Sequence, residues 1–254
     1  NLPYDVVVER LHIEEPEPPA PVTEPEKTFE EVLDEHPVSI QVNGQWQTFP
    51  NAKAAEEASY EEYKANLRRN AKNFRITDEH LGEGGPKAKF QANVNAIRLL
   101  KELEAAGQQA SPEQQEVLSR YVGWGGLSDA FDPEKPAWAL EYAQLKELLT
   151  PEEYAAARSS TLNAHYTSPT VIQAIYEAVD RMGFETGNIL EPSMGVGNFF
   201  GMLPEKMRNS RLYGVELDPV SGRIAKQLYP KADITVGGFE TTDRRDFFDL
   251  AIGN

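Results

Sequence analysis

The sequence of 254 residues contains no cysteine and only four histidines. The absence of cysteine excludes disulfide bonds and thiolate metal sites. No segment approaches the roughly twenty consecutive apolar residues that a membrane-spanning helix needs, and we recognise no basic-then-apolar leader. These absences favour a cytoplasmic protein without a membrane partner. Because the first residue is Asn1 rather than methionine, we expect a fragment of a longer protein.

Positive charge is also scarce. The chain has 25 Lys and Arg residues against 41 Asp and Glu residues, which gives a net charge of −16. Residues 1–60 carry 13 acidic and 3 basic side chains and so account for −10 of that charge. Proteins that bind nucleic acid usually present a basic surface. A DNA-binding surface would therefore have to be local, or lie on sequence outside this chain.

Composition divides the first part of the chain into two predicted regions. Residues 1–37 include a Pro- and Glu-rich run at 14–27 that cannot bury apolar area, which predicts an acidic, partly disordered linker region. Residues 38–75 predict a hairpin that turns at Asn43 and Gly44, followed by a helix over 52–73. We interpret the basic residues late in this helix as a solvated face, with a phosphate-contacting patch as the alternative.

Two further regions follow, with different periodicity. Residues 76–160 predict a helical domain, with helix starts at Ser111, Pro136 and Thr150. Between 161 and 254, apolar runs of strand length alternate with helix-like or loop segments, which predicts a parallel α/β sheet. These runs are Ile189–Leu190, Leu212–Val215, Ile234–Val236 and Leu250–Ile252. We expect the strand order 3-2-1-4, which leaves strand 4 as an unprotected edge that invites a second copy or another partner.

The segment before the first strand predicts a helix that begins at Ser168-Pro169. Its predicted apolar face consists of Val171, Ile172, Ile175, Val179 and Met182.

A glycine turn follows the first apolar run. Gly195 and Gly197 stand between that run and an expected helix, where glycine lets the backbone approach a ligand closely. Ligands of such sheets bind at the carboxyl ends of the strands. Glu216 ends the next run, where a carboxylate can accept two hydrogen bonds from a ribose diol. This combination predicts a nucleoside site, while Asp218 is better interpreted as a helix cap.

A nicotinamide-dependent dehydrogenase would also show glycines followed by an acid. Two other features favour a different enzyme: the upstream sequence Tyr-Thr-Ser-Pro at 166–169, and Asp249 followed by an apolar strand and Asn254. A fourth strand of this kind would deliver an amide to the active site. The dehydrogenase interpretation also lacks a recognisable substrate domain and proton-transfer group.

The motif order resembles that of the amino-methyltransferases of DNA. The matching segments are Tyr-Thr-x-Pro at 166–169, Glu-Pro-x-x-Gly-x-Gly-x-Phe at 191–199, Glu-x-Asp at 216–218 and Phe-Asp-x-x-x-x-Asn at 248–254. In more detail, 119–127 and 160–169 are similar to the methylase region of very large helicase-methylase proteins carried by bacterial conjugative and other mobile elements. The resemblance covers about residues 74–254.

The resemblance implies a Rossmann-like, S-adenosylmethionine-dependent methyltransferase fold that is truncated after strand 4. It implies methyl transfer to the exocyclic amino group of adenine (N6) in DNA, with cytosine N4 as the alternative target. The implied partners are DNA, bound through a longer parent protein, and a helicase domain C-terminal to this region in that parent.

The resemblance also implies roles for particular residues. Tyr166 and Thr167 would lie near the methionine end of the cofactor, and Glu216 would bind its ribose. The residues expected to form the rest of the cofactor site are Glu191, Pro192, Gly195 and Gly197, with Phe239 beside the adenine. Many relatives have an acid before that aromatic residue, where this chain has Gly238. Glu240 is a candidate substitute for the missing acid.

Asn254 matches the first residue of the catalytic Asn-Pro-Pro-Tyr type of motif. An exocyclic amino nitrogen is a poor nucleophile because its lone pair is delocalised into the ring. An Asn carbonyl and a following backbone carbonyl can accept its two N–H bonds, and an aromatic residue stacks on the flipped-out base. This chemistry requires no metal and no general-base histidine. Because the rest of the motif lies beyond Asn254, we expect the fragment itself to be inactive.

A second interpretation is a non-catalytic module. In that case the region binds S-adenosylmethionine, or nothing, and serves the assembly of a larger helicase, conjugation or anti-restriction protein. The acidic N-terminal region and the scarcity of basic residues favour this interpretation, whereas the motif set favours the enzyme.

Overall fold

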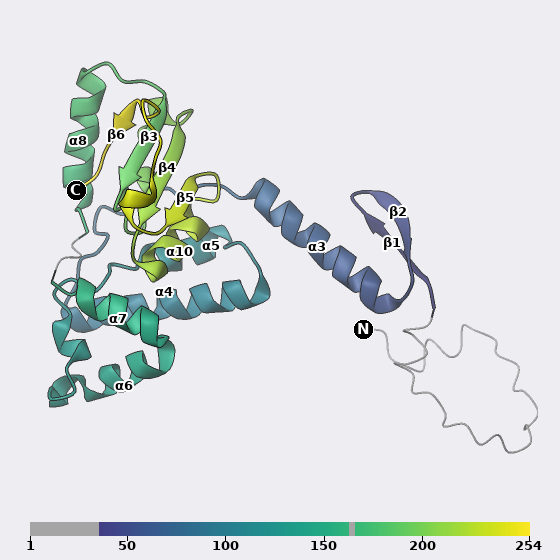
Figure 1. Cartoon of the computed structure of the whole chain (residues 1–254), viewed down its shortest axis with the longest axis horizontal. Coiled ribbons are helices and arrows are strands. Elements are labelled where there is room, and N and C mark those ends of the chain that lie inside the picture. The colour runs from purple at the N-terminus through teal and green to yellow at the C-terminus, as the bar shows by residue number, and fades with distance from the viewer. Residues whose placement is uncertain (1–35, 163–165) are drawn as a thin grey trace, which may run out of the picture. The chain divides into compact units, whose positions relative to one another are not determined.

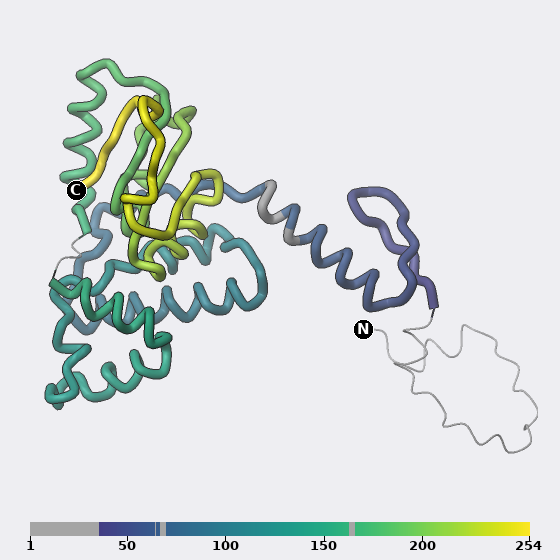
Figure 2. Tube along the Cα trace, viewed as in Figure 1, coloured from purple at the N-terminus to yellow at the C-terminus, as the bar shows by residue number. Residues whose placement is uncertain are grey.

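The computed structural model describes residues 36–162 and 166–254, whose course is drawn in Figure 1 and traced in Figure 2. Residues 1–35 of the predicted linker region lie outside the described residues. So do the side chains of three residues of the predicted basic face, Lys64, Arg68 and Arg69. The described residues form two compact units, which divide between Tyr60 and Glu61.

In the first unit, the predicted hairpin is confirmed. Strands β1 (Val38–Val42) and β2 (Gln45–Phe49) pair in antiparallel register. Asn43 and Gly44 have φ angles of 52° and 74°, and a two-residue type I′ turn requires positive φ at both positions. The helix predicted after the hairpin is α3 (Ala52–Asn70), which continues into the second unit.

After α3, the second unit continues with four helices. They are α4 (Pro86–Ala106), α5 (Pro112–Ser119), α6 (Ala139–Leu148) and α7 (Pro151–Ser160), with 3₁₀ turns at Ser128–Phe131 and Pro136–Trp138. The starts predicted at Ser111 and Thr150 are confirmed, whereas the segment predicted to open a helix at Pro136 begins with a 3₁₀ turn, and the α-helix starts at Ala139. Ser111 and Thr150 each accept the backbone N–H of the third helical residue and form capping boxes. Gly107 ends α4 with a φ angle of 61°. No helix in the described ranges combines the length and apolarity that a membrane crossing demands.

The sheet of this unit is parallel and has the strand order β5-β4-β3-β6. Its strands are β3 (Asn188–Pro192), β4 (Arg211–Glu216), β5 (Asp233–Val236) and β6 (Leu250–Ala251). Helix α8 (Pro169–Arg181) precedes β3, α9 (Asn198–Gly201) follows it, and α10 (Pro219–Leu228) connects β4 to β5. When these four strands are numbered along the chain, with β3 as strand 1, the order is 3-2-1-4, as predicted. This is the order of the first four strands of a Rossmann-like sheet. The predicted α/β fold is confirmed.

Helix α10 joins the sheet to the preceding helices. It packs against β4 and β5 and also against α4, α5 and α7. Buried side chains of these elements form one apolar core that extends from Phe74 to Ile252. Trp124 lies in this core and meets Tyr121 and Phe131 edge-on. The Gly-Trp-Gly-Gly segment at 123–126 therefore follows α5 and buries its Trp.

The prediction for the apolar face of α8 is wrong at two positions. Ile172 and Val179 are buried, but Val171 is 48% exposed and Met182 is 82% exposed. Tyr176 takes part in the buried face instead, and its hydroxyl donates to the Phe199 carbonyl at 2.8 Å. A buried Tyr hydroxyl usually finds a hydrogen-bond partner, which here is a backbone carbonyl.

Candidate functional site

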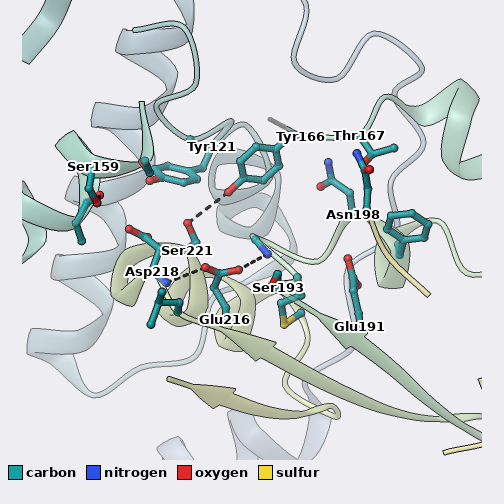
Figure 3. A pocket seen from close by; sticks show the side chains of 18 residues that line it. Tyr121, Ser159, Tyr166, Thr167, Glu191, Ser193, Asn198, Glu216, Asp218 and Ser221 are labelled. Carbon is teal, nitrogen blue, oxygen red and sulfur yellow. Dashed lines mark hydrogen bonds between the residues drawn. The ribbon is translucent and has the colours of Figure 1, made fainter. Parts of the chain in front are cut away.

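A cavity of about 390 Å³ opens beside the carboxyl ends of β3 and β4 (Figure 3). Small-molecule sites commonly enclose about 300–1,000 Å³. Strand β3 contributes Glu191 to the lining, and β4 contributes Glu216. The preceding helical segment contributes Tyr121, Gly123 and residues of α7, so the cavity is not made by the sheet alone.

Six of the predicted site residues line this cavity, namely Tyr166, Thr167, Glu191, Gly195, Glu216 and Asn254. Three do not, namely Pro192, Gly197 and Phe239. Gly197 has a φ angle of 83°, and a Cβ there would lie 2.6 Å from the Tyr229 ring. Gly197 therefore lets the turn pack against the Tyr229 ring and does not face the cavity. Phe239 begins a 3₁₀ turn (Phe239–Thr241) and is 51% exposed.

Glu216 organises the middle of the cavity. Its Oε2 accepts the Gly195 N–H at 2.6 Å, and its Oε1 accepts the Asp218 N–H at 2.7 Å. Each carboxylate oxygen has a second lone pair, so Glu216 can still accept from the hydroxyls of a ligand. Burial raises the pKa of Glu216. The charge of Asp218 also raises it, whereas the hydrogen bonds from the Asp218 and Gly195 N–H groups lower it. Asp218 itself caps α10 by accepting the Ser221 N–H at 2.7 Å, as predicted.

Glu191 is the most deeply buried acid of the cavity, with 3% of its surface exposed. Burial raises the pKa of Glu191 well above the usual range of a carboxyl group. Hydrogen bonds from the Phe199 and Phe200 N–H groups lower this pKa, and the charge of Glu216 raises it further. The Oε2 of Glu191 has no hydrogen-bond partner among the described residues. A buried polar atom without a partner is costly, so this oxygen is a candidate contact for a ligand donor.

Tyr166 is held between two glycines. A Cβ at Gly123 would lie 2.6 Å from its ring, and a Cβ at Gly195 would lie 3.0 Å from it. Both glycines also have positive φ angles, 68° and 57°, which side chains rarely adopt. The Tyr166 hydroxyl lies 3.4 Å from Ser221 Oγ on α10. Tyr166 thus spans the cavity between the helical segment and the sheet.

Gly123 lines the cavity but was not among the predicted site residues, because the Gly-Trp-Gly-Gly run at 123–126 carries no signal specific to a ligand. The fully buried Asn93 on α4 fixes this segment: its Nδ2 donates to the Gly123 carbonyl at 2.6 Å, and its Oδ1 accepts the Val122 N–H at 2.9 Å. A single Asn inside a helix carries no sequence signal for such a role. The close packing of Gly123 against the ring of Tyr166, which is distant in sequence, is visible only in the folded structure.

Asn254 lies at the Thr167 side of the cavity. Its Nδ2 donates to Thr167 Oγ1 at 3.2 Å. This bond engages the NH₂ group, so the side-chain carbonyl is the atom that can accept a hydrogen bond from a substrate. Strand β6, which precedes Asn254, is fixed beside β3 because Asp249 Oδ2 accepts the Asn188 N–H at 2.7 Å. The strand therefore presents the amide to the cavity.

The lining of the cavity is acidic. Glu191, Glu216 and Asp218 supply three carboxyl groups, and none of the described lining residues is Lys, Arg or His. The described lining therefore supplies no cationic side chain to pair with the pyrophosphate of a dinucleotide. This charge pattern disfavours the dehydrogenase interpretation.

Comparisons with known proteins give two relatives by sequence. The chain is 26% identical over 176 residues to Defense against restriction protein B of Escherichia phage P1, which covers 68% of this chain and 6% of that protein. It is 45% identical over 71 residues to a type II methyltransferase of Paramecium bursaria Chlorella virus XZ-6E, which covers 28% of this chain and 18% of that enzyme. No family model matches the chain.

This is a methyltransferase-like region. The chain spans only a small part of the length of either relative. Among solved structures, it is similar to a protein of Listeria monocytogenes described as a class I S-adenosylmethionine-dependent methyltransferase, with 16% identity and a TM-score of 0.33 over 66% of this chain and 58% of that one.

Proposed function

We propose that this methyltransferase-like region binds S-adenosylmethionine and belongs to a DNA methyltransferase that acts on the exocyclic amino group of adenine (N6). The convergence of Gly195, Glu216 and Asn254 on one cavity is the observation that carries the proposal. The 45% identity to a type II methyltransferase over 71 residues supports it.

The chemistry of the lining fits this cofactor. S-adenosylmethionine carries a positive sulfonium, an ammonium group and a ribose diol. The free lone pairs of Glu216 suit the diol, and the unpartnered Oε2 of Glu191 suits a positively charged donor. The described lining offers no cation to repel these charges. When bound, the cofactor supplies an activated methyl group.

Asn254 would hold the substrate amino group for transfer. Its side-chain carbonyl would accept one N–H of the exocyclic amine, which localises the lone pair on the nitrogen. The base must leave the DNA stack to reach this position. Thr167 acts as a positioning residue because its hydroxyl accepts from the NH₂ group of the Asn254 side chain.

A second candidate function is a cofactor-binding or assembly module of a larger anti-restriction protein. The similarity to Defense against restriction protein B over 68% of this chain supports it. The two candidates differ in what Asn254 does, since an assembly module has no need of an amide at the cavity.

Replacing Asn254 with Ala tests the catalytic assignment. In the full natural protein that contains this sequence, we expect Asn254→Ala to lower methyl transfer to DNA by at least about a hundredfold, the scale of losing one preorganised hydrogen-bonding group. Binding of S-adenosylmethionine should stay nearly unchanged, because Asn254 is assigned to the substrate. Transfer of labelled methyl groups to duplex DNA, with product nucleosides separated, measures both the rate and the target base.

The matched control is Glu216→Ala, which should abolish cofactor binding as well as transfer. Methylated cytosine as the product would move the target to N4. Transfer that survives Asn254→Ala would refute the catalytic assignment, and a wild-type protein that binds the cofactor but never transfers would favour the assembly module.

A further inference from the structure

One polar side chain, Asn93, stands in the otherwise apolar buried face of α4. The other buried residues of this helix are Phe90, Val94, Ala96, Ile97, Leu100 and Leu103. Asn93 is fully buried, and both ends of its amide are used: Nδ2 donates to the Gly123 carbonyl at 2.6 Å, and Oδ1 accepts the Val122 N–H at 2.9 Å. Two bonds from one planar amide fix both the position and the orientation of the backbone at Val122 and Gly123.

The backbone that Asn93 holds packs against the ring of Tyr166. A Cβ at Gly123 would lie 2.6 Å from Cε2 of this ring, and a Cβ at Gly195 would lie 3.0 Å from Cε1. These two carbons stand on opposite sides of the ring, so the ring packs closely against Gly123 on one side and Gly195 on the other. The Tyr166 hydroxyl lies 3.4 Å from Ser221 Oγ (Figure 3). Gly123 and Tyr166 line the cavity, whereas Asn93 does not.

We propose that Asn93 is a positioning residue for the cofactor: it holds Gly123 against the Tyr166 ring and so keeps this wall of the cavity in the shape that binds S-adenosylmethionine. The inference rests on the proposed function and adds to it a residue outside the cavity lining. Helix α4 is then part of the cofactor-binding unit and not of a separate helical domain. This agrees with the single compact unit that the chain forms from Glu61 onward.

Helix α4 also holds the residue that follows Gly123. Phe90 lies one turn before Asn93, and its ring meets the Trp124 ring edge-on with 6.0 Å between the centroids. The helix therefore fixes Gly123 from both sides along the chain, through the Val122 N–H before it and the Trp124 ring after it. Support by a rigid element of secondary structure is what lets a site hold a side chain in a productive geometry.

An apolar side chain at position 93 would pack in this core but leave two backbone groups without partners. Because a buried, unpaired backbone group is unfavourable, the segment at Val122 and Gly123 would shift to reach water or another partner. Gly123 adjoins the Tyr166 ring, so such a shift either moves the ring or opens a gap beside it. The effect of the substitution would therefore reach the cavity, although Asn93 lies behind its wall.

The first test replaces Asn93 with Leu, which has a similar volume and makes neither hydrogen bond. By calorimetry with S-adenosylmethionine, we expect Asn93→Leu to weaken binding by about tenfold or more. The matched control is Gln115→Leu. Gln115 is also a buried amide, and it donates to the carbonyls of Lys72, Gln227 and Leu228, none of which lines the cavity. Gln115→Leu should lower the melting temperature as Asn93→Leu does, but bind within about twofold of wild type.

A second test asks whether Asn93 acts through Tyr166. Asn93→Leu and Tyr166→Ala are measured singly and together. Effects that pass through one contact are not additive, so Asn93→Leu should change the affinity by no more than about twofold once the ring is absent. A residue that only stabilises the fold would weaken binding by the same factor with and without the ring.

The inference alone is overturned if Asn93→Leu binds as wild type does, if Gln115→Leu loses as much affinity, or if the effects of Asn93→Leu and Tyr166→Ala simply add. Should Asn93→Leu fail to fold, Asn93→Ser takes its place with Gln115→Ser as its control, because a serine hydroxyl is too short to reach both backbone groups. A folded wild-type protein that binds no S-adenosylmethionine would overturn the proposed function, and the inference with it.

Discussion

At the scale of single residues, Glu191 lowers the stability of the ligand-free protein but offers a contact to a ligand. Its carboxyl group is buried with one oxygen unpaired, which is unfavourable in the ligand-free protein. The same oxygen is available to a cationic ligand. Sites that keep an uncompensated group for a ligand commonly lose some stability for that reason.

The raised pKa of Glu191 determines how its effect on stability changes with pH. Because burial raises this pKa in the folded protein, the contribution of Glu191 to stability is fully present below its ordinary pKa and is lost as pH rises through the folded value. We expect Glu191→Gln to raise the melting temperature of the ligand-free protein above neutral pH, and to flatten its decline with pH. Melting temperatures across a pH series measure this, with a shift of about 2–4 °C for each kcal/mol in a chain of this size.

The same variant should bind S-adenosylmethionine more weakly, because Gln carries no negative charge. A residual pH slope should remain, since the pKa of Glu216 is raised as well. A variant that is less stable than wild type above neutral pH would contradict the assignment of Glu191 as an uncompensated acid.

At the scale of secondary-structure elements, the ion pairs of Glu153 with Lys101 and Arg223 (the Glu153 cluster) join α4, α7 and α10. Burial alone would raise the pKa of Glu153, but its hydrogen bonds with Lys101, the Thr150 N–H and Arg223 lower it below the ordinary value. A lowered carboxyl pKa contributes stability that is present above the unfolded-state pKa and is lost as pH falls through the folded value.

We therefore expect Glu153→Gln to lower the free energy of unfolding at neutral pH by roughly 2 kcal/mol, the scale of lost charged hydrogen bonds. It should also make the acid-induced loss of stability shallower. Urea unfolding at several pH values measures both effects. The control is Glu152→Gln, which changes an exposed acid on the same turn. Equal effects of the two changes would mean that the cluster does not hold α7.

Most of these elements could be predicted from the sequence because their signals are local. Proline after Ser or Thr marked the starts of α5 and α7, and Asn43-Gly44 marked the hairpin turn. The exposed Val171 and Met182 could not be predicted, since periodicity does not say which neighbours cover a helix. The buried Tyr176 depends on an acceptor from another element, the Phe199 carbonyl.

Prediction of the site was limited for a related reason. Gly195 and Glu216 stand in motifs that follow adjacent strands, so their convergence follows from the parallel order of the sheet. The roles of Tyr121, Gly123 and Ser159 could not be predicted, because they come from the helical segment that packs over those strands. Sequence spacing indicates which residues share a strand end, but not which neighbouring helix completes the cavity.

At the scale of the whole molecule, the free edge of β6 bears on association. Within the described residues, β6 pairs with β3 and with no other strand. Unpaired backbone groups on an edge can pair with another chain. We expect this chain to associate with itself at high concentration through that edge, which sedimentation equilibrium can detect.

Ala251 of β6 is exposed, so Ala251→Lys should suppress association while leaving the melting temperature close to that of wild type. The matched change Ala155→Lys, on exposed α7, should have no such effect. A wild-type chain that stays monomeric at every concentration, or a dimer indifferent to Ala251→Lys, would rule out pairing through this edge.

The placement of Tyr166 between Gly123 and Gly195 has a consequence for how this chain can vary. A methyl group at either glycine would meet the aromatic ring, whereas a small residue at 166 would leave both glycines facing a void. Positions 123, 166 and 195 should therefore tolerate exchange only in concert. In a randomised library selected for folding, the three should covary even though the chain reaches them in three separate segments.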